Sequence, residues 1–296
     1  MGGAGEGNAS GSPSAGGADA TDAGSPGPED AQVNEFHHPL GPDLDEGREV
    51  YRFETFGNEG FWTRALRLPQ GMESTGLTIA GALELGLNFD IESVPAALRA
   101  QLTDEAKTDL SAAKAPLMND PLAFIELLEA NAVVGLPARN VAELNGKLEI
   151  DEQDVLAGES VGMSCALCHS ITDGSVYSLP HGGGIGKRFD GLPNHDLDFG
   201  AMIALGEGTR AYYPTLALDL EANDHKSVSR KGPGVALISK AGTEEEVDAF
   251  VTDPDLYPVG MFDDATDGNA APLKNASIFR TDLAAPWGTD GSIEQL

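Results

Sequence analysis

Two cysteines, Cys165 and Cys168, are the only ones in this chain of 296 residues, and they stand three positions apart in the stretch GMSCALCHSITDG. His169 follows the second cysteine directly. A pair of thiols and an imidazole at this spacing can form a redox or structural disulfide, help to bind zinc, or attach a c-type haem. Each of these sites needs different surroundings in the sequence.

The surroundings of the pair give little support to a disulfide or to zinc. A thioredoxin-type pair should follow a strand within a βαβ pattern, and we find no such pattern before Cys165. A structural zinc site needs four ligands, usually with a second Cys or His pair at matching spacing. The other histidines include a single adjacent pair; they are His37, His38, His181, His195 and His225. Both kinds of site stay open as alternatives.

Haem attachment accounts for all three residues of the motif. On a helix, positions i, i+3 and i+4 share one face. The two thiols can therefore reach the two vinyl groups of one porphyrin while the imidazole binds its iron. Because both thiols become thioethers, no third cysteine is needed. We expect one covalent haem c held by Cys165 and Cys168, with His169 as the proximal iron ligand.

From the motif onward, over roughly residues 150–296, the chain resembles the cytochrome c superfamily. The pattern of helix signals predicts a mostly α chain with a helical N-terminal segment, and the resemblance implies that a cytochrome c-like helical haem domain with long loops follows it. In that family the motif ends a short helix, and an aromatic residue stands four positions before the first cysteine. This chain has Val161 there, which puts the usual helix–helix contact in question.

The stretch GGGIGKRFDGLPNH, which begins at Gly182, is similar to the Gly-rich loop on the proximal side of such domains. The resemblance implies that its backbone accepts the ring N–H of His169, which would fix the orientation of the imidazole. It also implies that Arg188 or Lys187 pairs with a haem propionate. A charged loop in contact with solvent is the alternative for both basic residues.

The C-terminal stretch PLKNASIFRTDLAAPWGTDGSIEQL resembles a segment of larger bacterial cytochromes of the dihaem peroxidase and rubber-oxygenase type. The matching residues are Pro272, Leu273, Asn275, Pro286, Trp287, Asp290, Gly291, Ser292 and Leu296. Thr289 replaces a histidine that is common in those proteins, which also carry two CxxCH motifs instead of one. The resemblance therefore implies their architecture and not their enzymatic activity.

The sixth iron ligand separates the two functions that such a haem allows. An electron carrier fills that position, whereas a peroxidase- or oxygenase-like haem enzyme leaves the distal site open. We expect an electron carrier with Met261 as the distal ligand, because the Pro- and Gly-containing stretch YPVGMFDD is typical of loops that place this methionine in the superfamily. Met202, His181 or His195, an open site and a ligand beyond Leu296 remain alternatives.

Helix end signals mark three elements outside the motif. In DPLAFIELLEANAVVG, Asp120 is the expected N-cap, a proline takes the first helical position, and Gly135 lies just past the expected end. A second helix is expected over LRAQLTDEAKTDLSAAKAP, ending at Pro116. Thr243 begins the capping box of a third helix in TEEEVDAFV. Strand-like alternation is scarce.

Three segments follow from composition and pattern: a tether over residues 1–32, a helical segment over 33–150 and the haem domain over 151–296. The tether is rich in Gly, Ser, Pro and Asp and is expected to be disordered. It resembles the linker behind the lipidated cysteine of bacterial lipoproteins, with a plain disordered tail as the alternative. Because haem attachment of this type occurs outside the bacterial cytoplasm, we expect a periplasmic or other extracytoplasmic location and an export signal encoded ahead of residue 1. The linker resemblance adds a lipid anchor at that end as one alternative.

The net charge limits the classes of molecule that the protein can bind. The chain carries 48 acidic and 18 basic residues, a formal net charge of −30. Nucleic acids need a cationic protein face, so they are excluded as partners. A field this negative steers the protein toward basic surfaces. We expect a redox partner protein with a basic docking face.

Overall fold

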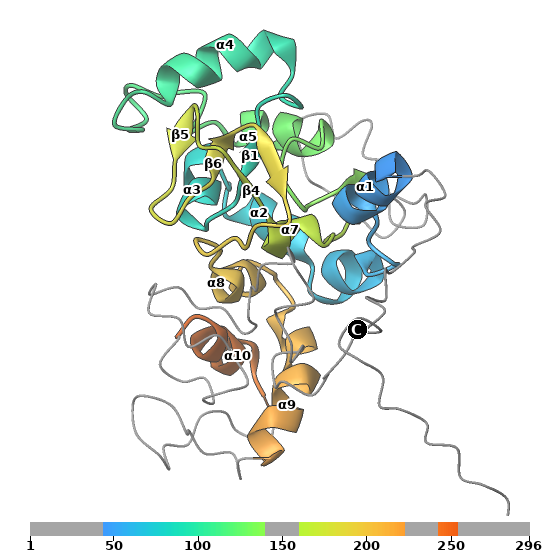
Figure 1. Ribbon diagram of the computed structural model, residues 1–296. Helices are drawn as coiled ribbons and strands as arrows, with labels where there is room; N and C mark the ends of the chain where they lie inside the picture. The colour runs from blue at the N-terminus through green and yellow to red at the C-terminus, as the bar shows by residue number, and fades with distance from the viewer. Residues whose placement is uncertain (1–43, 140–159, 223–241, 254–296) are drawn as a thin grey trace, which may run out of the picture. The chain divides into compact units, whose positions relative to one another are not determined.

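A computed structural model describes residues 44–139, 160–222 and 242–253 of the chain (Figure 1). Its α-helices are α1 (Leu44–Phe53), α2 (Leu68–Ser74), α3 (Ile79–Glu84), α4 (Ala96–Glu105), α5 (Pro121–Glu129), α7 (Ala166–His169), α8 (Phe199–Ala204), α9 (Tyr213–Ala222) and α10 (Glu244–Val251). A π-helix, η1 (Gly60–Ala65), and a 3-10 helix, η2 (Thr209–Tyr212), complete the helical elements of these ranges. The strands are β1 (Phe89–Asp90), β2 (Ala138–Arg139), β3 (Ser160–Val161), β4 (Ser170–Thr172), β5 (Tyr177–Ser178), β6 (Gly184–Gly186) and β7 (Arg188–Asp190).

The expectation of a mostly α, cytochrome c-like helical fold is wrong. Helices make up 46% and strands 11% of the chain that is placed, and the strands form three small sheets. Most of them lie after the motif, where the sequence predicted loops. The physical reason is visible at Gly184, whose φ is 108° and whose missing side chain lets the backbone approach Tyr177. Strands that contain such glycines do not show the alternation of apolar and polar residues from which a strand is predicted in a sequence.

Two of the three sheets join the segments on either side of the motif to the N-terminal part of the chain, and the third joins two strands that follow the motif. In the first, β6 lies between β1, to which it is parallel, and β5, to which it is antiparallel. The second is the antiparallel pair β2 and β3. The third pairs β4 with β7, so that Thr172 lies opposite Arg188. Because β4 follows α7 without a gap, this pairing fixes the direction in which the chain leaves the motif.

The predicted helix starts are confirmed, but two of the predicted ends are wrong. The Asp120 side chain accepts the N–H of Leu122 at 2.9 Å, and the Thr243 capping box is complete. Helix α5 ends at Glu129, and Asn131, with φ 52°, takes the left-handed position expected of Gly135. Helix α4 ends at Glu105, well before Pro116. Starts depend on local side-chain bonds, whereas these ends depend on packing.

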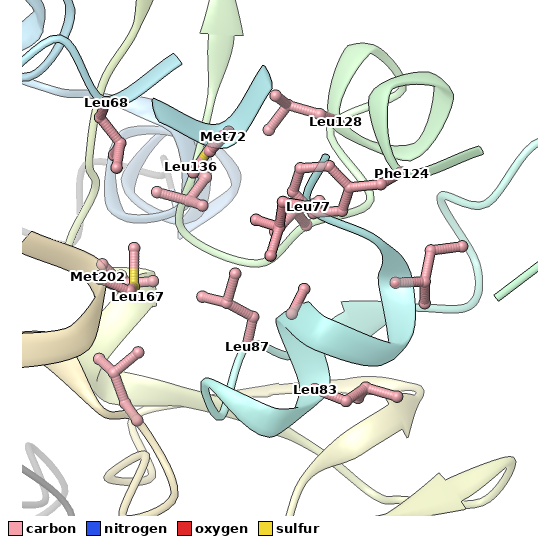
Figure 2. Packing of buried hydrophobic residues seen from close by; sticks show 14 of the residues in the cluster. Leu68, Met72, Leu77, Leu83, Leu87, Phe124, Leu128, Leu136, Leu167 and Met202 are labelled. Atoms are coloured by element: carbon pink, nitrogen blue, oxygen red, sulfur yellow. The ribbon is translucent and has the colours of Figure 1, made fainter. Parts of the chain in front are cut away.

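One hydrophobic core joins the described parts of the 33–150 and 151–296 segments. Leu167 of α7 and Met202 of α8 are both fully or almost fully buried, and both belong to the same cluster as Phe124 and Leu128 of α5 (Figure 2). Full burial of a leucine side chain contributes about 1.5–3 kcal/mol. The motif helix is therefore anchored in the core by Leu167. The predicted tether, residues 1–32, lies outside the described residues.

Among the helices that the structure describes, none combines the length and the apolar character needed to cross a membrane.

Candidate functional site

The motif lies on a short helix with one face in the core and one face outside it. Ala166 and Leu167 are buried, whereas Cys165 is exposed and Cys168 and His169 are half-buried. Both cysteines are free thiols. The burial pattern follows from helical spacing, since positions i, i+3 and i+4 share a face. Two thiols and an imidazole therefore lie on the accessible side of α7.

The carbonyl groups at the end of α7 are held by three donors. The N–H of Gly191 and the hydroxyl of Tyr51 donate to the carbonyl oxygen of His169, at 2.7 and 2.5 Å. The N–H of Asn194 donates to the carbonyl oxygen of Cys168 at 2.9 Å. Carbonyls at a helix end have no partner within the helix. A four-residue helix is thus fixed at its C-terminus from two sides.

Helix α1 brackets the motif through the serines on either side of it. Ser164, just before Cys165, donates its hydroxyl to the carbonyl oxygen of Arg52 at 2.7 Å. Ser170, just after His169, lies 3.3 Å from the Tyr51 hydroxyl and 3.0 Å from a carboxylate oxygen of Asp190. Both ends of the motif are therefore tied to one helix of the N-terminal part.

An ion pair strengthens this attachment. Arg52 of α1 contacts the Asp190 carboxylate of β7 through Nε at 2.8 Å and through Nη2 at 2.6 Å. Both side chains are three-quarters buried, so solvent screens the pair less than it would at an open surface. Burial is also the largest cause of the raised pKa of Tyr51, which keeps its phenol protonated as a donor.

The segment entering the motif is equally fixed. The Asn58 side chain donates to the carbonyl oxygen of Met163 at 2.7 Å and accepts its N–H at 3.0 Å. The Thr63 hydroxyl makes the same pair of bonds to Val161, at 2.8 and 3.0 Å. Val161 stands where the cytochrome c pattern has an aromatic residue, and it is fully buried on β3. Polar side chains of the N-terminal part thus position the chain that leads into α7.

A glycine lets the core approach α7 closely. Gly135 has φ 81°, and a Cβ placed on it would lie 2.1 Å from the backbone nitrogen of Leu167. Its carbonyl oxygen also accepts the N–H of Ser164 at 3.0 Å. The role of Gly135 is therefore to seat the motif helix, and not to end α5 as the sequence suggested.

The two thiols differ in their surroundings. Cys168 packs against the core, and desolvation, with a smaller contribution from nearby Cys165, raises the pKa of its thiol to about 12. Reactive cysteines of disulfide oxidoreductases have lowered pKa values instead. At neutral pH Cys168 is thus a protonated thiol and not a thiolate nucleophile.

Arg188, which the resemblance pairs with a propionate, is buried on β7. Its Nε lies 3.5 Å from a carboxylate oxygen of Asp90, and its guanidinium lies 5.5 Å from the centre of the Phe53 ring. Within the placed part of the chain, its Nε and Nη1 have no hydrogen-bond partner. Burial, followed by the positive charge of Arg52, lowers the pKa of Arg188. A buried guanidinium with unsatisfied donors has the chemistry that a carboxylate completes.

The other basic candidate lies differently. Lys187 is exposed, and its ammonium lies 3.8 Å from the carboxylate of Glu92. The Gly-rich loop does approach His169, through the Gly191 N–H and the His169 carbonyl oxygen. Whether its backbone also accepts the ring N–H of His169 stays a prediction.

The candidates for the distal ligand are scattered. Met261 lies outside the described residues, as does the C-terminal stretch of the second resemblance. Met202 is fully buried and serves as core packing. His181 pairs through Nδ1 with Asp196 at 2.9 Å, and His195 is exposed. Among the residues with assigned positions, no group of three or more His, Cys, Asp and Glu side chains could hold a metal ion.

Sequence reasoning found the motif but missed the residues that hold it. Tyr51, Asn58 and Thr63 lie about a hundred residues before the motif and carry no local signal of their role. The sequence around them shows only a cluster of aromatic residues, in the stretch RFETFGNEGFW over 52–62. Neither a protein-family model, nor a curated protein, nor a solved structure matches this chain. Function must therefore be inferred from the site itself.

Proposed function

We propose that this chain is a c-type cytochrome that carries one haem, bound covalently through Cys165 and Cys168 with His169 as the proximal iron ligand, and that it transfers electrons. The observation that carries the proposal is the placement of two cysteine side chains, not joined to each other, and an imidazole on one short, firmly held helix, with Cys165 exposed and Cys168 and His169 half-buried. Covalent haem attachment assigns a role to all three side chains at this spacing without a further protein ligand on the same side.

The state of the thiols favours attachment over the alternatives. Each S–H would add across one vinyl C=C bond, sulfur bonding to one carbon and hydrogen to the other, with no net oxidation. This addition needs reduced cysteines, and Cys165 and Cys168 are not joined by a disulfide. A thioredoxin-type redox pair follows a strand within a βαβ pattern, whereas the strand before this motif, β3, belongs to a two-stranded antiparallel sheet. A structural zinc site needs more ligands than the motif supplies.

The chain's own residues orient the iron ligand. Tyr51, Gly191 and Asn194 hold the carbonyls at the end of α7, and they thereby fix the backbone from which the His169 imidazole projects. Arg188, whose buried Nε and Nη1 have no hydrogen-bond partner among the described residues, would hold a propionate, and this would lower the cost of burying that carboxylate. When bound, haem supplies an iron that alternates between ferric and ferrous states.

The sixth ligand decides between carrier and enzyme. We propose Met261, whose thioether opposite an imidazole would raise the reduction potential. Changing Met261 to alanine should then abolish the weak sulfur–iron absorption band and lower the potential. An unchanged spectrum and potential would remove Met261 from the site. An open distal site would favour the peroxidase- or oxygenase-like alternative.

Location and partner follow from the same chemistry. Covalent haem attachment of this type takes place outside the bacterial cytoplasm, so we propose an extracytoplasmic protein. The net charge of −30 favours a redox partner with a basic docking face.

The test is a set of absorption spectra on protein from a host with c-type haem maturation. The wild type should give the sharp reduced bands of a haem bound through two thioethers. Cys165→Ala or Cys168→Ala should leave a vinyl group and shift those bands to longer wavelength. His169→Ala should lose the proximal ligand, and added imidazole should partly restore the spectrum. Colourless wild-type protein from this host, with zinc bound instead, would overturn the proposal.

A further inference from the structure

A polar groove of about 730 Å³ lies apart from the motif helix. Its walls come from α3, from residues 108–111 and from the segment that begins with β5 (Figure 1). None of residues 165–169 lines it. The proposed haem does not use this groove, so it needs an explanation of its own.

His181 is held at the groove by a buried carboxylate. Asp196 is 7% exposed; one of its oxygens accepts the backbone N–H of His181 and the other contacts the ring Nδ1, both at 2.9 Å. A carboxylate only accepts hydrogen bonds, so Nδ1 carries the proton in this pair. The other ring nitrogen, Nε2, has no hydrogen-bond partner among the residues that the structure places. In the neutral imidazole Nε2 is therefore a fixed hydrogen-bond acceptor.

The other charged side chains that line the groove are all acidic. Glu84 and Asp109 contribute carboxylates, and the lining contains no lysine or arginine. Asp109 is bound by Lys114 and by Ser111, which lower the pKa of its carboxyl group and keep it ionised. Glu84 is exposed and forms no ion pair within the described ranges. The groove is therefore lined both by the unpaired carboxylate of Glu84 and by His181, whose Nε2 accepts a hydrogen bond.

Tyr177 and two leucines add a surface that is less polar. Tyr177 is half-buried and lines the groove, and its ring face attracts cations. Leu83 and Leu179 line the groove and are 3% and 8% exposed, so they offer only a small apolar surface. The groove therefore combines an N–H acceptor, a carboxylate, an aromatic ring and a small apolar surface.

We propose that this groove binds a small primary or secondary alkylamine in its ammonium form. The cation is favoured by Glu84 and by the Tyr177 ring, while an ammonium N–H donates to Nε2 of His181. The alkyl chain lies on Leu83 and Leu179. Anions are excluded by the carboxylates, and a quaternary ammonium lacks the N–H that His181 requires. This site goes beyond the proposed haem function and does not depend on it.

The test is calorimetric titration of the full chain with n-butylamine at neutral pH and moderate salt. We expect saturable binding in the millimolar range, which a ligand this small can reach. The neutral isostere n-butanol and tetramethylammonium should bind at least about tenfold more weakly, since each lacks one of the required interactions. Equal binding of n-butanol, or no saturable binding of the amine, overturns the proposal without any variant.

Matched variants locate the site. Glu84→Gln and His181→Gln should each weaken amine binding by about tenfold or more. Glu126→Gln removes the same charge from an exposed position on α5 outside the groove and should leave binding unchanged. Unchanged binding in both groove variants, or an equal loss in Glu126→Gln, would show attraction to the protein's overall charge and overturn the site. If haem is present, its absorption bands must stay constant, because bands that shift with saturation place the amine on the iron instead.

Discussion

At the scale of single residues, the two thiols of the motif should behave differently before any haem is attached. Cys165 is exposed, whereas the pKa of Cys168 is raised to about 12 by burial. A rise of the pKa from 9.0 to about 12 lowers the thiolate fraction at pH 8 by roughly a thousandfold. The order of reaction therefore reports directly on the packing around α7.

We expect iodoacetamide to alkylate Cys165 well before Cys168 in chain made without haem maturation. Because burial raises the pKa of Cys168, its alkylation rate should keep rising as the pH is raised beyond about 10, where the rate of an ordinary thiol levels off. Peptide mass spectrometry at several times and pH values gives both rates. Equal rates at pH 8 would mean that Cys168 does not pack as described.

Tyr51 should stabilise the protein and tune the proposed haem. Its hydroxyl donates to the His169 carbonyl oxygen, and its loss in Tyr51→Phe leaves that carbonyl with one donor fewer. The free energy of unfolding should fall by about 1–2 kcal/mol in urea denaturation. Tyr177→Phe is the control, since no hydrogen bond of its hydroxyl is recorded within the placed residues. If Tyr51 positions the iron ligand, Tyr51→Phe should also shift the reduction potential of the haem. If its role is purely structural, the potential should not change.

At the scale of elements, glycine at position 135 has two possible roles: it permits a positive φ, and it leaves room for the backbone of α7. These two roles can be measured separately. Gly135 and Gly57 have φ values of 81° and 80°, so alanine is strained at both. Only at Gly135 would the new Cβ meet another element, the backbone of Leu167 at 2.1 Å; at Gly57 nothing lies within 4 Å. The difference between the two variants therefore measures the contact with α7.

Gly135→Ala should lose at least about 2 kcal/mol more stability than Gly57→Ala, because overpacking at a backbone contact forces α7 to move. Thermal and urea unfolding of both variants give the difference. The yield of covalent haem should fall in Gly135→Ala alone. Equal losses in the two variants would contradict the close seat of the motif helix.

The elements also show what the sequence can and cannot predict. The start of α5 at Asp120 and the capping box at Thr243 were predictable because they depend on bonds within a few residues. The strands between residues 170 and 190 were not, because each is only two or three residues long, and β6 also pairs with β1, which lies far earlier in the chain. The motif was predictable from spacing alone, while Tyr51 and Gly135 acquire their roles only through long-range packing.

At the scale of the whole molecule, the net charge of −30 should control electron exchange. If the protein carries a haem, its reduced form should react with the cation hexaammineruthenium(III) at a rate that falls as salt is added. The rate with the anion ferricyanide should rise with salt, because screening removes repulsion. Stopped-flow rates at several ionic strengths give the two slopes. Slopes of the same sign would show that the charge does not govern access to the haem.

The central claim is that Cys165 and Cys168 bind haem covalently, and intact mass tests it most directly. Protein from a host with c-type maturation is extracted with acidified acetone, which removes haem that is not covalently bound, and its mass is then measured. We expect the mass of the chain plus one haem, with the colour remaining in the protein. The mass of the chain alone, with colour in the solvent or none at all, would contradict the account.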